Sequence, residues 1–375
     1  MSSKIQFLAY YLPQYHPIPE NDTWWGKGFT EWTNVKKAKP LFKGHNQPIK
    51  PGEFGYYDLL QTERIQEKQA QLAIEYGIDG FIYYQYYFGE NKMLLEKPAE
   101  KMLANKNVAI PFCFCWANES WKGTWHGLDN PGVLIEQIYD GAEGYIKYFN
   151  YLLPFFNDER YIKVDNKPMF HVYRLEDIPD LDIFIEVFNK MAVESGFEGI
   201  YLISTLGNKT TYLDNPKIYG KVGLDAFHYI RYSKQLFLES KSIFFKIIYR
   251  ITDLICGEDG IIVKVRKPFI YDYEKGVSQL NFELPNRKYI YCVFPNWDNS
   301  ARSGMKSLIF KNSNPLSWKK HFQKAVDALM KNNENPSYIF IKSWNEWAEG
   351  NYLEPDEKYG RDWLEVVKEI KSNLN

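Results

Sequence analysis

The sequence predicts a (β/α)8 barrel, an α/β fold, on two observations. Eight short apolar runs alternate with segments of helical periodicity along the 375 residues, and this is the order of elements in a parallel α/β protein. Several runs are apolar on both faces, as in Tyr338-Ile-Phe-Ile341, which is typical of a buried parallel strand. The alternative, a doubly wound open sheet, is disfavoured because no glycine-rich phosphate turn follows the first run.

The eight apolar runs are interpreted as the barrel strands. In chain order the predicted strands are 5–11, 80–87, 108–116, 168–173, 199–205, 225–229, 288–294 and 338–342. Helices are predicted between them at 58–76, 142–155, 183–195, 318–331 and 363–373. The first should end at Gly77, a good residue just past a helix, and the fourth should begin after Ser317 as its N-cap.

The chain is expected to form one domain over residues 1–375, because it contains no internal repeat and no low-complexity linker. A long first loop, 12–57, and an insertion at about 230–285 between the sixth and seventh strands interrupt the pattern. Within the insertion, 242–255 is basic and strongly apolar. It fits either a contact with a membrane surface or a lipid-linked substrate, or a helix packed on the barrel, and the packed helix is favoured because apolar stripes are usually core.

Composition narrows the function. The net charge is −1 and no basic stripe occurs, so a nucleic-acid partner is not expected. Aromatic residues make up 17% of the chain and cluster beside polar ones, as in Tyr83-Tyr-Gln-Tyr-Tyr87. Sugar rings have apolar faces and polar rims, which such surfaces suit.

Compartment and cofactors are also constrained. The four cysteines are interpreted as reduced structural residues, Cys113 and Cys115 on one face of a strand. With no signal peptide and no apolar run of about 18 residues, the protein is expected in the cytoplasm, with the inner membrane face as the alternative set by 242–255. No metal site is predicted, since Asp180 and Asp182 precede a helix and fit caps better, and no cofactor is expected.

The most informative segment follows the last strand. It reads Ser343-Trp-Asn-Glu346-Trp-Ala-Glu349-Gly-Asn-Tyr-Leu-Glu354-Pro. Barrel enzymes carry their chemistry at the C-terminal ends of strands. Two carboxylates three residues apart can lie side by side, and glycosidic bond cleavage uses such a pair, about 5–5.5 Å apart in retaining enzymes. The alternative is a solvated capping pair on the final helix, which the flanking tryptophans disfavour.

A resemblance makes this specific. Trp344-Asn-Glu-Trp-Ala-Glu-Gly350 resembles the Asn-Glu-Trp-x-Glu-Gly signature of the family-99 glycoside hydrolases. The chain as a whole resembles the WbsX family, called glycosyltransferases and assigned to O-antigen and capsule gene clusters. Further segments that carry this resemblance are Ala9-Tyr-Tyr-Leu-Pro-Gln-Tyr-His-Pro17, Trp24-Trp-Gly-Lys-Gly-Phe-Thr-Glu-Trp-Thr-Asn-Val35, Phe42-Lys-Gly-His-Asn-Gln-Pro48, Phe54-Gly-Tyr-Tyr-Asp-Leu59, Trp116-Ala-Asn-Glu119 and Asn296-Trp-Asp-Asn299.

The resemblance implies a (β/α)8 barrel that acts on an oligosaccharide or lipid-linked glycan. The hydrolases cleave α-mannosides within a chain with retention, through participation of the sugar's own 2-hydroxyl. By motif, Glu346 matches the carboxylate that deprotonates this hydroxyl, and Glu349 matches the general acid/base. The hydrolases have His where this chain has Ala348, which puts the same substrate and reaction in doubt.

Candidate substrate-binding residues lie near predicted strand ends or in the resembling segments. They are Tyr10, Tyr11, Gln14, His16, Glu31, Trp32, Trp116, Asn118, Glu119, Trp297, Asp298, Trp344, Asn345 and Trp347. For several of them a structural role, such as loop capping, is the open alternative. Glu354 is interpreted as support for the loop rather than as a third acid.

Three functions remain. The first is an enzyme of polysaccharide biosynthesis that cleaves or transfers a glycosidic bond with Glu346 and Glu349. The second is a glycosyltransferase with a lipid-linked or nucleotide sugar donor, the nucleotide being disfavoured by the missing fingerprint. The third is a non-catalytic glycan-binding barrel.

Overall fold

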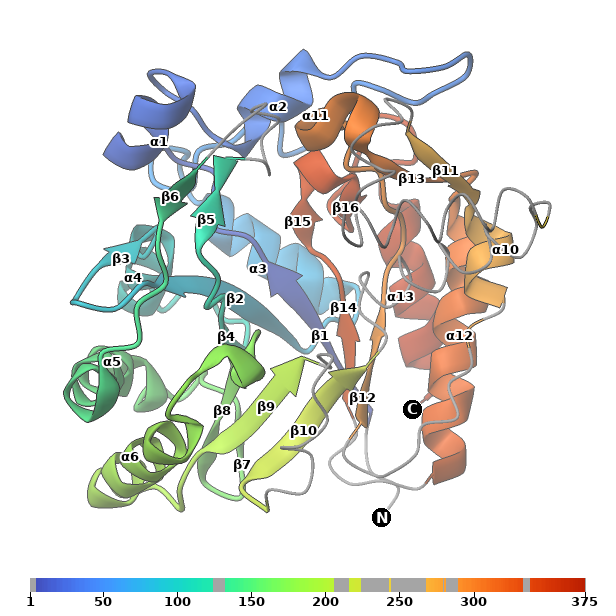
Figure 1. Cartoon of the computed structure of the whole chain (residues 1–375). Helices are drawn as coiled ribbons and strands as arrows, with labels where there is room; N and C mark the ends of the chain where they lie inside the picture. The colour runs from blue at the N-terminus through green and yellow to red at the C-terminus, as the bar shows by residue number, and fades with distance from the viewer. Residues whose placement is uncertain are drawn as a thin grey trace.

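A ring of parallel strands organises the molecule (Figure 1). The computed structural model describes residues 5–123, 132–205, 216–223, 243, 268–278, 280, 289–332 and 338–374. The ring strands within them are β1 (Gln6–Tyr11), β2 (Gly80–Tyr87), β4 (Phe112–Trp116), β8 (Lys167–Val172), β9 (Tyr201–Thr205), β10 (Ile218–Gly223), β12 (Tyr289–Val293) and β14 (Tyr338–Ile341). Each pairs in parallel with the next, and β1 pairs with both β14 and β2. The predicted (β/α)8 barrel is confirmed.

The sixth strand differs from its prediction. The barrel strand at that position is β10, whereas the predicted 225–229 lies outside the described residues. The sequence of β10 is Ile-Tyr-Gly-Lys-Val-Gly. Its two glycines and its lysine interrupt the apolar run by which a buried strand is recognised in a sequence. A Cβ on Gly220 would lie 2.8 Å from the Ile290 side chain. Glycine at this position therefore allows neighbouring strands to pack closely. In the sequence the same glycine looks like the end of a strand.

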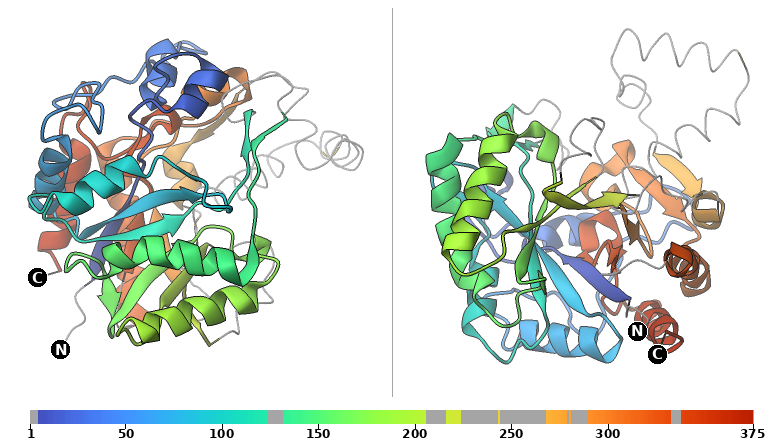
Figure 2. Two further views of the ribbon diagram at one scale, coloured as in Figure 1. Left: turned by 90° about the vertical axis from the view of Figure 1, so that its left-hand side faces the viewer. Right: turned by 90° about the horizontal axis from the view of Figure 1, so that it is seen from below.

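Helices follow the strands and cover the outside of the ring (Figure 2). They are α3 (Ile65–Glu75), α4 (Lys97–Ala104), α5 (Gly141–Phe156), α6 (Leu181–Glu194), α12 (Pro315–Asn332) and α13 (Asp362–Ser372). α5 packs against α6, and α12 packs against α13.

Two helix starts correct the predictions. α12 begins at Pro315, and Asn314 is its cap: its Oδ1 accepts the Ser317 N–H at 3.1 Å while Ser317 Oγ accepts the Asn314 N–H at 3.1 Å. Ser317 is therefore inside the first turn. α3 begins at Ile65 rather than at 58, because Asp58 Oδ1 accepts the N–H groups of Leu60 and Gln61 in a turn.

The first loop, 12–57, contains two short helices that were not predicted from the sequence. α1 (Pro19–Trp25) and α2 (Glu31–Lys37) lie within 12–57, and both are too short to show a clear apolar period. The other short elements are β3 (Met93–Leu94), β5 (Trp121–Lys122), β6 (Val133–Ile135), β7 (Lys163–Val164), β11 (Phe269–Asp272), α10 (Tyr273–Ser278), α11 (Ser300–Ser303), β13 (Leu308–Lys311), β15 (Asn345–Glu346) and β16 (Asn351–Tyr352), with single 3-10 turns η2 (Leu175–Asp177), η3 (Gly304–Lys306) and η4 (Trp347–Glu349). Of 242–255, all but Ile243 lies outside the described residues.

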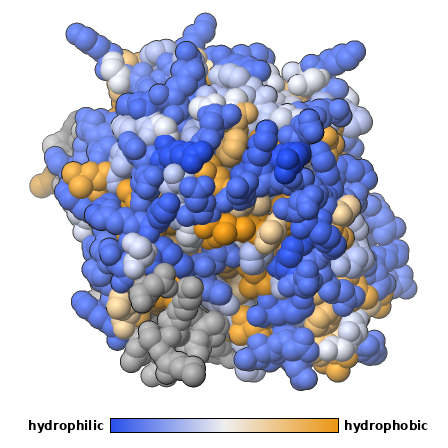
Figure 3. Space-filling view, turned by 180° about the vertical axis from the view of Figure 1, so that it is seen from behind, coloured by the Kyte–Doolittle hydropathy of each residue, from blue (hydrophilic) through white to orange (hydrophobic). Residues whose placement is uncertain are grey.

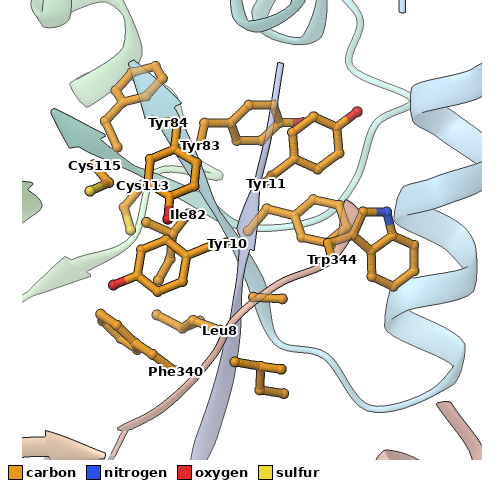
Figure 4. Packing of buried hydrophobic residues seen from close by; sticks show 14 of the residues in the cluster. Leu8, Tyr10, Tyr11, Ile82, Tyr83, Tyr84, Cys113, Cys115, Phe340 and Trp344 are labelled. Carbon is orange, nitrogen blue, oxygen red and sulfur yellow. The ribbon is translucent and has the colours of Figure 1, made fainter. Parts of the chain in front are cut away.

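Side chains of each strand alternate between the inside of the ring and the helix layer (Figure 4). Tyr10 and Tyr84 point inward and stack with ring centroids 5.3 Å apart, whereas Tyr11 points outward. Cys113 and Cys115 both point inward, as expected from their spacing, and both are free and buried.

The face seen from behind is covered mainly by hydrophilic side chains, with small apolar areas between them (Figure 3). In the described part of the chain, no helix combines the length and the apolar character that crossing a bilayer requires.

Candidate active site

A cavity of about 390 Å³ opens at the C-terminal ends of the barrel strands, and we call it the active-site cavity. The described residues that line it follow or end β1, β2, β4, β8, β12 and β14. They are Leu12, Gln14, Tyr84, Tyr86, Ala117, Glu119, Trp121, Tyr173, Arg174, Trp297, Asn299, Arg302, Ser303, Lys342, Glu346 and Glu349. Aromatic rings alternate here with charged groups, which matches the two surfaces of a sugar ring.

Glu346 and Glu349 lie on one small hairpin. β15 carries Glu346, η4 ends at Glu349, and β16 returns antiparallel to β15. Gly350 makes the turn with a φ of 53°, and a Cβ there would lie 2.8 Å from the Asp298 carbonyl oxygen. The pair is therefore on a tight turn beside the cavity, and not at the start of the final helix α13.

Buried hydrogen bonds fix this hairpin to the barrel. Asn345 Oδ1 accepts the Leu12 N–H at 2.7 Å, and the Asn345 side-chain amide donates to the Leu12 carbonyl at 3.1 Å. The Asp298 N–H donates to the Glu349 carbonyl at 2.8 Å. The two carboxyls are therefore held by contacts to the ends of β1 and β12.

Glu354 fixes the hairpin through hydrogen bonds to two of its tryptophans. Its carboxylate is fully buried and accepts hydrogen bonds from Gln69 at 2.6 Å, Trp344 at 3.0 Å and Trp347 at 2.6 Å, and from Tyr57. Burial raises the pKa of Glu354 to about 7 against the effect of these donors. Glu354 does not line the cavity, which agrees with its predicted supporting role.

Glu346 sits at the base of the cavity, 4% exposed. Burial raises its pKa to about 8, the hydrogen bond and charge of Glu349 add to this rise, and Lys342, at 3.9 Å from Nζ to Oε2, opposes it. Near neutral pH burial therefore favours the protonated form of Glu346.

Arg302 joins two carboxylates. Its Nη1 lies 2.6 Å from Glu349 Oε1 and its Nη2 lies 2.6 Å from Glu31 Oε1. Glu31 is fully buried at the start of α2, where burial raises its pKa while Arg302 lowers it. The guanidinium thereby orders Glu349 and favours its ionised form.

The structure brings five of the predicted site residues to the cavity wall: Gln14, Glu119, Trp297, Glu346 and Glu349. Glu119 binds Arg174 at 2.6 Å, and Gln14 donates to the Tyr86 hydroxyl at 3.2 Å. Lys342 Nζ lies 5.5 Å from the centre of the Trp297 ring.

The aromatic candidates outside the wall are buried behind it. Tyr10 is inside the ring beneath Tyr84, and its hydroxyl pairs with His171 at 3.2 Å. Tyr11 and Trp344 face the helix layer. Trp116 donates to the Tyr87 carbonyl at 2.8 Å. Trp32 and Trp347 pack on each other at 5.5 Å.

The polar candidates outside the wall are occupied by structural bonds. Asn118 donates to the Arg174 carbonyl at 2.8 Å, and Asp298 binds His45 at 2.7 Å. Asn345 serves the hairpin as described, and Glu31 reaches the site through Arg302. His16 is buried, and its Nδ1 pairs with the Pro17 carbonyl at 3.2 Å.

Sequence reasoning missed several lining residues. Tyr173 and Lys342 end two predicted strands, and Tyr84 and Tyr86 lie two apart on a third, so the rule that chemistry gathers at strand ends could have found them. Arg302 lies on the short helix α11 and shows no local signal.

No metal site emerges from the described residues, which contain no group of three or more His, Cys, Asp or Glu side chains arranged to hold an ion. Asp180 occupies the N-cap position of α6, and its carboxylate accepts the Tyr145 hydroxyl.

Solved structures with a similar fold include a glycoside hydrolase and a protein described as glycoside hydrolase-like. The GH99 endo-alpha-mannosidase from Bacteroides thetaiotaomicron superimposes with a TM-score of 0.56 at 13% identity, covering 98% of this chain and 97% of that one. A glycoside hydrolase-like protein superimposes with a TM-score of 0.55 at 13% identity, covering 98% and 94%. At these identities the likeness concerns the fold.

Sequence comparisons point to a family. The uncharacterized protein WxcX of Xanthomonas campestris pv. campestris, strain B100, is 32% identical over 365 residues, and the homologue in strain ATCC 33913 has the same identity. These residues are 96% of this chain and 49% of the relative, so the chain spans about half the length of the curated relatives it matches. The profile of the family described as Glycosyltransferase WbsX matches residues 7–367. This chain, a (β/α)8 barrel with a paired-carboxyl cavity, therefore belongs to the WbsX glycosyltransferase family, a family of carbohydrate-active enzymes.

Proposed function

We propose that this protein cleaves or transfers a glycosidic bond of a cell-surface polysaccharide or its lipid-linked precursor, with Glu346 and Glu349 as catalytic carboxyls. The observation that carries the proposal is that both side chains extend from one small hairpin and line the same aromatic cavity. Two carboxyls that line one cavity can act as acid and base on one anomeric centre.

The protonation states of the pair support a specific division of labour. In the free protein burial favours protonated Glu346, and Arg302 favours ionised Glu349. The motif assigns the opposite states, with Glu346 as base toward the sugar 2-hydroxyl and Glu349 as acid. A 2-hydroxyl that donates to Glu346 stabilises its ionised form, and the proton then passes from Glu346 to Glu349. Lys342, at 3.9 Å, stabilises the Glu346 anion so formed.

In the next step Glu346 accepts the 2-hydroxyl proton and the 2-oxygen attacks the anomeric carbon. Glu349 donates its proton to the departing glycosidic oxygen, and the C–O bond breaks. Opening of the 1,2-anhydro sugar by water or by an acceptor hydroxyl returns both protons and gives a retained product. Whether the chain hydrolyses or transfers depends on which hydroxyl enters this second step.

Hydrolysis and transfer both use the Arg302–Glu349 ion pair. It favours the carboxylate that takes the proton from the entering water or acceptor hydroxyl. A role in O-antigen or capsule assembly in the cytoplasm forms part of this proposal, and the free thiols of Cys113 and Cys115 are consistent with a reducing compartment. The contact of 242–255 with a membrane stays a prediction.

The test is a mass-spectrometric screen against α-linked oligosaccharides and lipid-linked repeat units. We expect shortened or lengthened glycans from the wild type and none from Glu346→Gln or Glu349→Gln, with both variants folded by circular dichroism. Glu75→Gln, an exposed position at the end of α3, is the matched control and should keep full turnover. Unchanged turnover in both active-site variants would reject the proposal, and binding without turnover in the wild type would favour a glycan-binding barrel.

A further inference from the structure

A second cavity lies on the other side of the catalytic hairpin. It has a volume of about 660 Å³, and we call it the outer cavity. Its walls come from the loop 42–49, the segment 296–298 after β12, the segment 309–314 at the end of β13, and the stretch 350–363 that follows the hairpin. The segment Phe42-Lys-Gly-His-Asn46, which the catalytic proposal leaves without a role, forms one wall.

The charges around the outer cavity are unbalanced. Lys43, Lys311 and Lys358 are exposed at its walls, and none of them forms an ion pair with a carboxylate of the described residues. Asp298 is the only acidic side chain among the described lining residues. Its carboxylate already accepts hydrogen bonds from His45 at 2.7 Å, Gln47 at 2.9 Å and the Ser300 N–H at 3.0 Å.

Those bonds occupy the oxygens of Asp298 without removing its negative charge. Burial opposes its ionisation, but the donors outweigh burial and lower its pKa. Asp298 therefore stays ionised with its oxygens held by the protein, and the three lysine ammonium groups outnumber its charge around the cavity. Three like charges around one concave surface attract an anion and focus its approach.

The outer cavity also offers flat apolar faces. Phe42 stacks on His45 with ring centroids 4.4 Å apart and an interplanar angle of 11°, and Tyr359 is half-buried beneath the Lys358 ammonium at 4.5 Å. Aromatic faces beside cations suit a sugar ring that carries a negative group.

The two cavities share Trp297. This residue lines both, is 4% exposed, and has an indole N–H without a partner among the described residues. In the active-site cavity the Lys342 ammonium lies over its ring. Trp297 therefore places the two cavities side by side, as an extended ligand that occupies both would require.

We propose that the outer cavity binds an anionic portion of the glycan substrate, either the carboxylate of an acidic sugar or the phosphate of a lipid-linked carrier. This inference rests on the proposed function, because it specifies the class of glycan that the proposed enzyme binds. It makes the lysines specificity-determining residues outside the catalytic pair.

The test measures binding, so that it is independent of turnover. Calorimetry with the Glu349→Gln protein uses an oligogalacturonate, a neutral oligosaccharide of equal length and inorganic pyrophosphate as probes. We expect the oligogalacturonate or the pyrophosphate to bind, the neutral sugar to bind at least about ten-fold more weakly, and the affinity to fall as salt rises. Oligogalacturonate binding alone identifies an acidic sugar, and pyrophosphate binding alone identifies a phosphate carrier.

A triple variant, Lys43→Gln with Lys311→Gln and Lys358→Gln, should weaken binding of the anionic probe at least about ten-fold. The matched control changes Lys97, Lys147 and Lys190 to Gln, which are exposed on α4, α5 and α6 and alter the net charge equally. Equal affinity in the triple variant and the control, or no preference for anionic probes, overturns the inference. A catalytic failure instead appears as turnover retained in Glu346→Gln, which leaves this binding result unaffected.

Discussion

Nη1 of Arg302 lies 2.6 Å from Oε1 of Glu349, so a catalytic candidate from the last strand end is held by a side chain from the short helix after β12. The same guanidinium binds buried Glu31 from the first loop. Three segments that are distant in sequence thus meet on one cation, and this relationship makes the site testable away from the carboxyls themselves.

Arg302→Gln should lower the free energy of unfolding by about 3–5 kcal/mol, because it leaves Glu31 buried without its counter-ion. It should also reduce kcat, because Glu349 loses its orientation. Urea unfolding and initial rates measure the two effects. Arg361→Gln is the control: its pair with Glu53 is exposed, with 42% and 38% of the two side chains accessible, and its loss should cost under about 1 kcal/mol. Similar costs for both variants would contradict the bridging role.

The rate should fall at alkaline pH. Because burial raises the pKa of Glu346 to about 8, Glu346 loses its proton above that value. We expect kcat/KM of the free enzyme to decline about ten-fold per pH unit above pH 8. A profile that stays flat from pH 7 to 10 would exclude this pair as the proton source.

Stability should also depend on Glu346. Its folded-state pKa of about 8 lies above the ordinary 4.5, so the native protein binds a proton more tightly than the unfolded chain. The wild type therefore loses free energy of unfolding as pH rises from 4.5 to 8, by about 1.4 kcal/mol per pH unit for this group. Glu346→Gln removes that loss, so its stability relative to the wild type should rise by about 4 kcal/mol between pH 5 and pH 9. Urea unfolding at both pH values checks this, and parallel pH slopes in the two proteins would refute it.

Glu354→Gln should loosen the hairpin. The substitution replaces one carboxylate oxygen, which accepts buried N–H or O–H groups, by an NH2 group that faces the same donors. We expect the free energy of unfolding to fall by about 1–3 kcal/mol. Because Glu354 acts through position, kcat should fall while the alkaline limb of the pH profile stays where it is. Glu357→Gln, 60% exposed and paired with Lys50, is the nearby control and should change neither quantity.

Gly350→Ala and Gly360→Ala form a matched pair. Both glycines have φ near +55°, so both substitutions carry a similar backbone cost of about 1 kcal/mol. Only at Gly350 does the new Cβ meet the Asp298 backbone, at 2.8 Å, whereas Gly360 has open space. We expect a much larger loss of activity and stability for Gly350→Ala, measured by turnover and by thermal unfolding. Equal losses would mean that contact with the β12 end does not position the hairpin.

The barrel was largely predictable because its strands are buried on both faces and their apolar runs survive in the sequence. β2 was predicted at its observed bounds. The prediction of the sixth strand was wrong because close packing places glycines in β10. The helices α1 and α2 were not predicted because seven residues are too few to show a helical period.

The candidate site was predictable only in part. Glu346 and Glu349 stood out through their spacing after a strand, and Gln14, Glu119 and Trp297 through position. Tyr11 and Trp344 also lie in the resembling segments, but their side chains point to the helix layer. Trp116 likewise packs against Tyr148 of α5, with ring centroids 5.1 Å apart. Arg302 reaches the site across 47 residues to Glu349 and 271 residues to Glu31, and no local pattern encodes such a contact.

The first and last strands of the ring, β1 and β14, pair with each other and close it. The hairpin that carries Glu346 and Glu349 is bonded to the end of β1 at this junction, which we call the seam. The Trp344 N–H donates to the Tyr10 carbonyl at 2.7 Å, and Asn345 grips Leu12 on both its backbone groups. A chain that has formed every ring strand up to β12 still lacks both proposed catalytic carboxyls and the β14 partner of β1. Catalytic competence should therefore arise in one late step, when β14 docks beside β1, and during refolding activity should return together with the last protected amides of that seam rather than ahead of them.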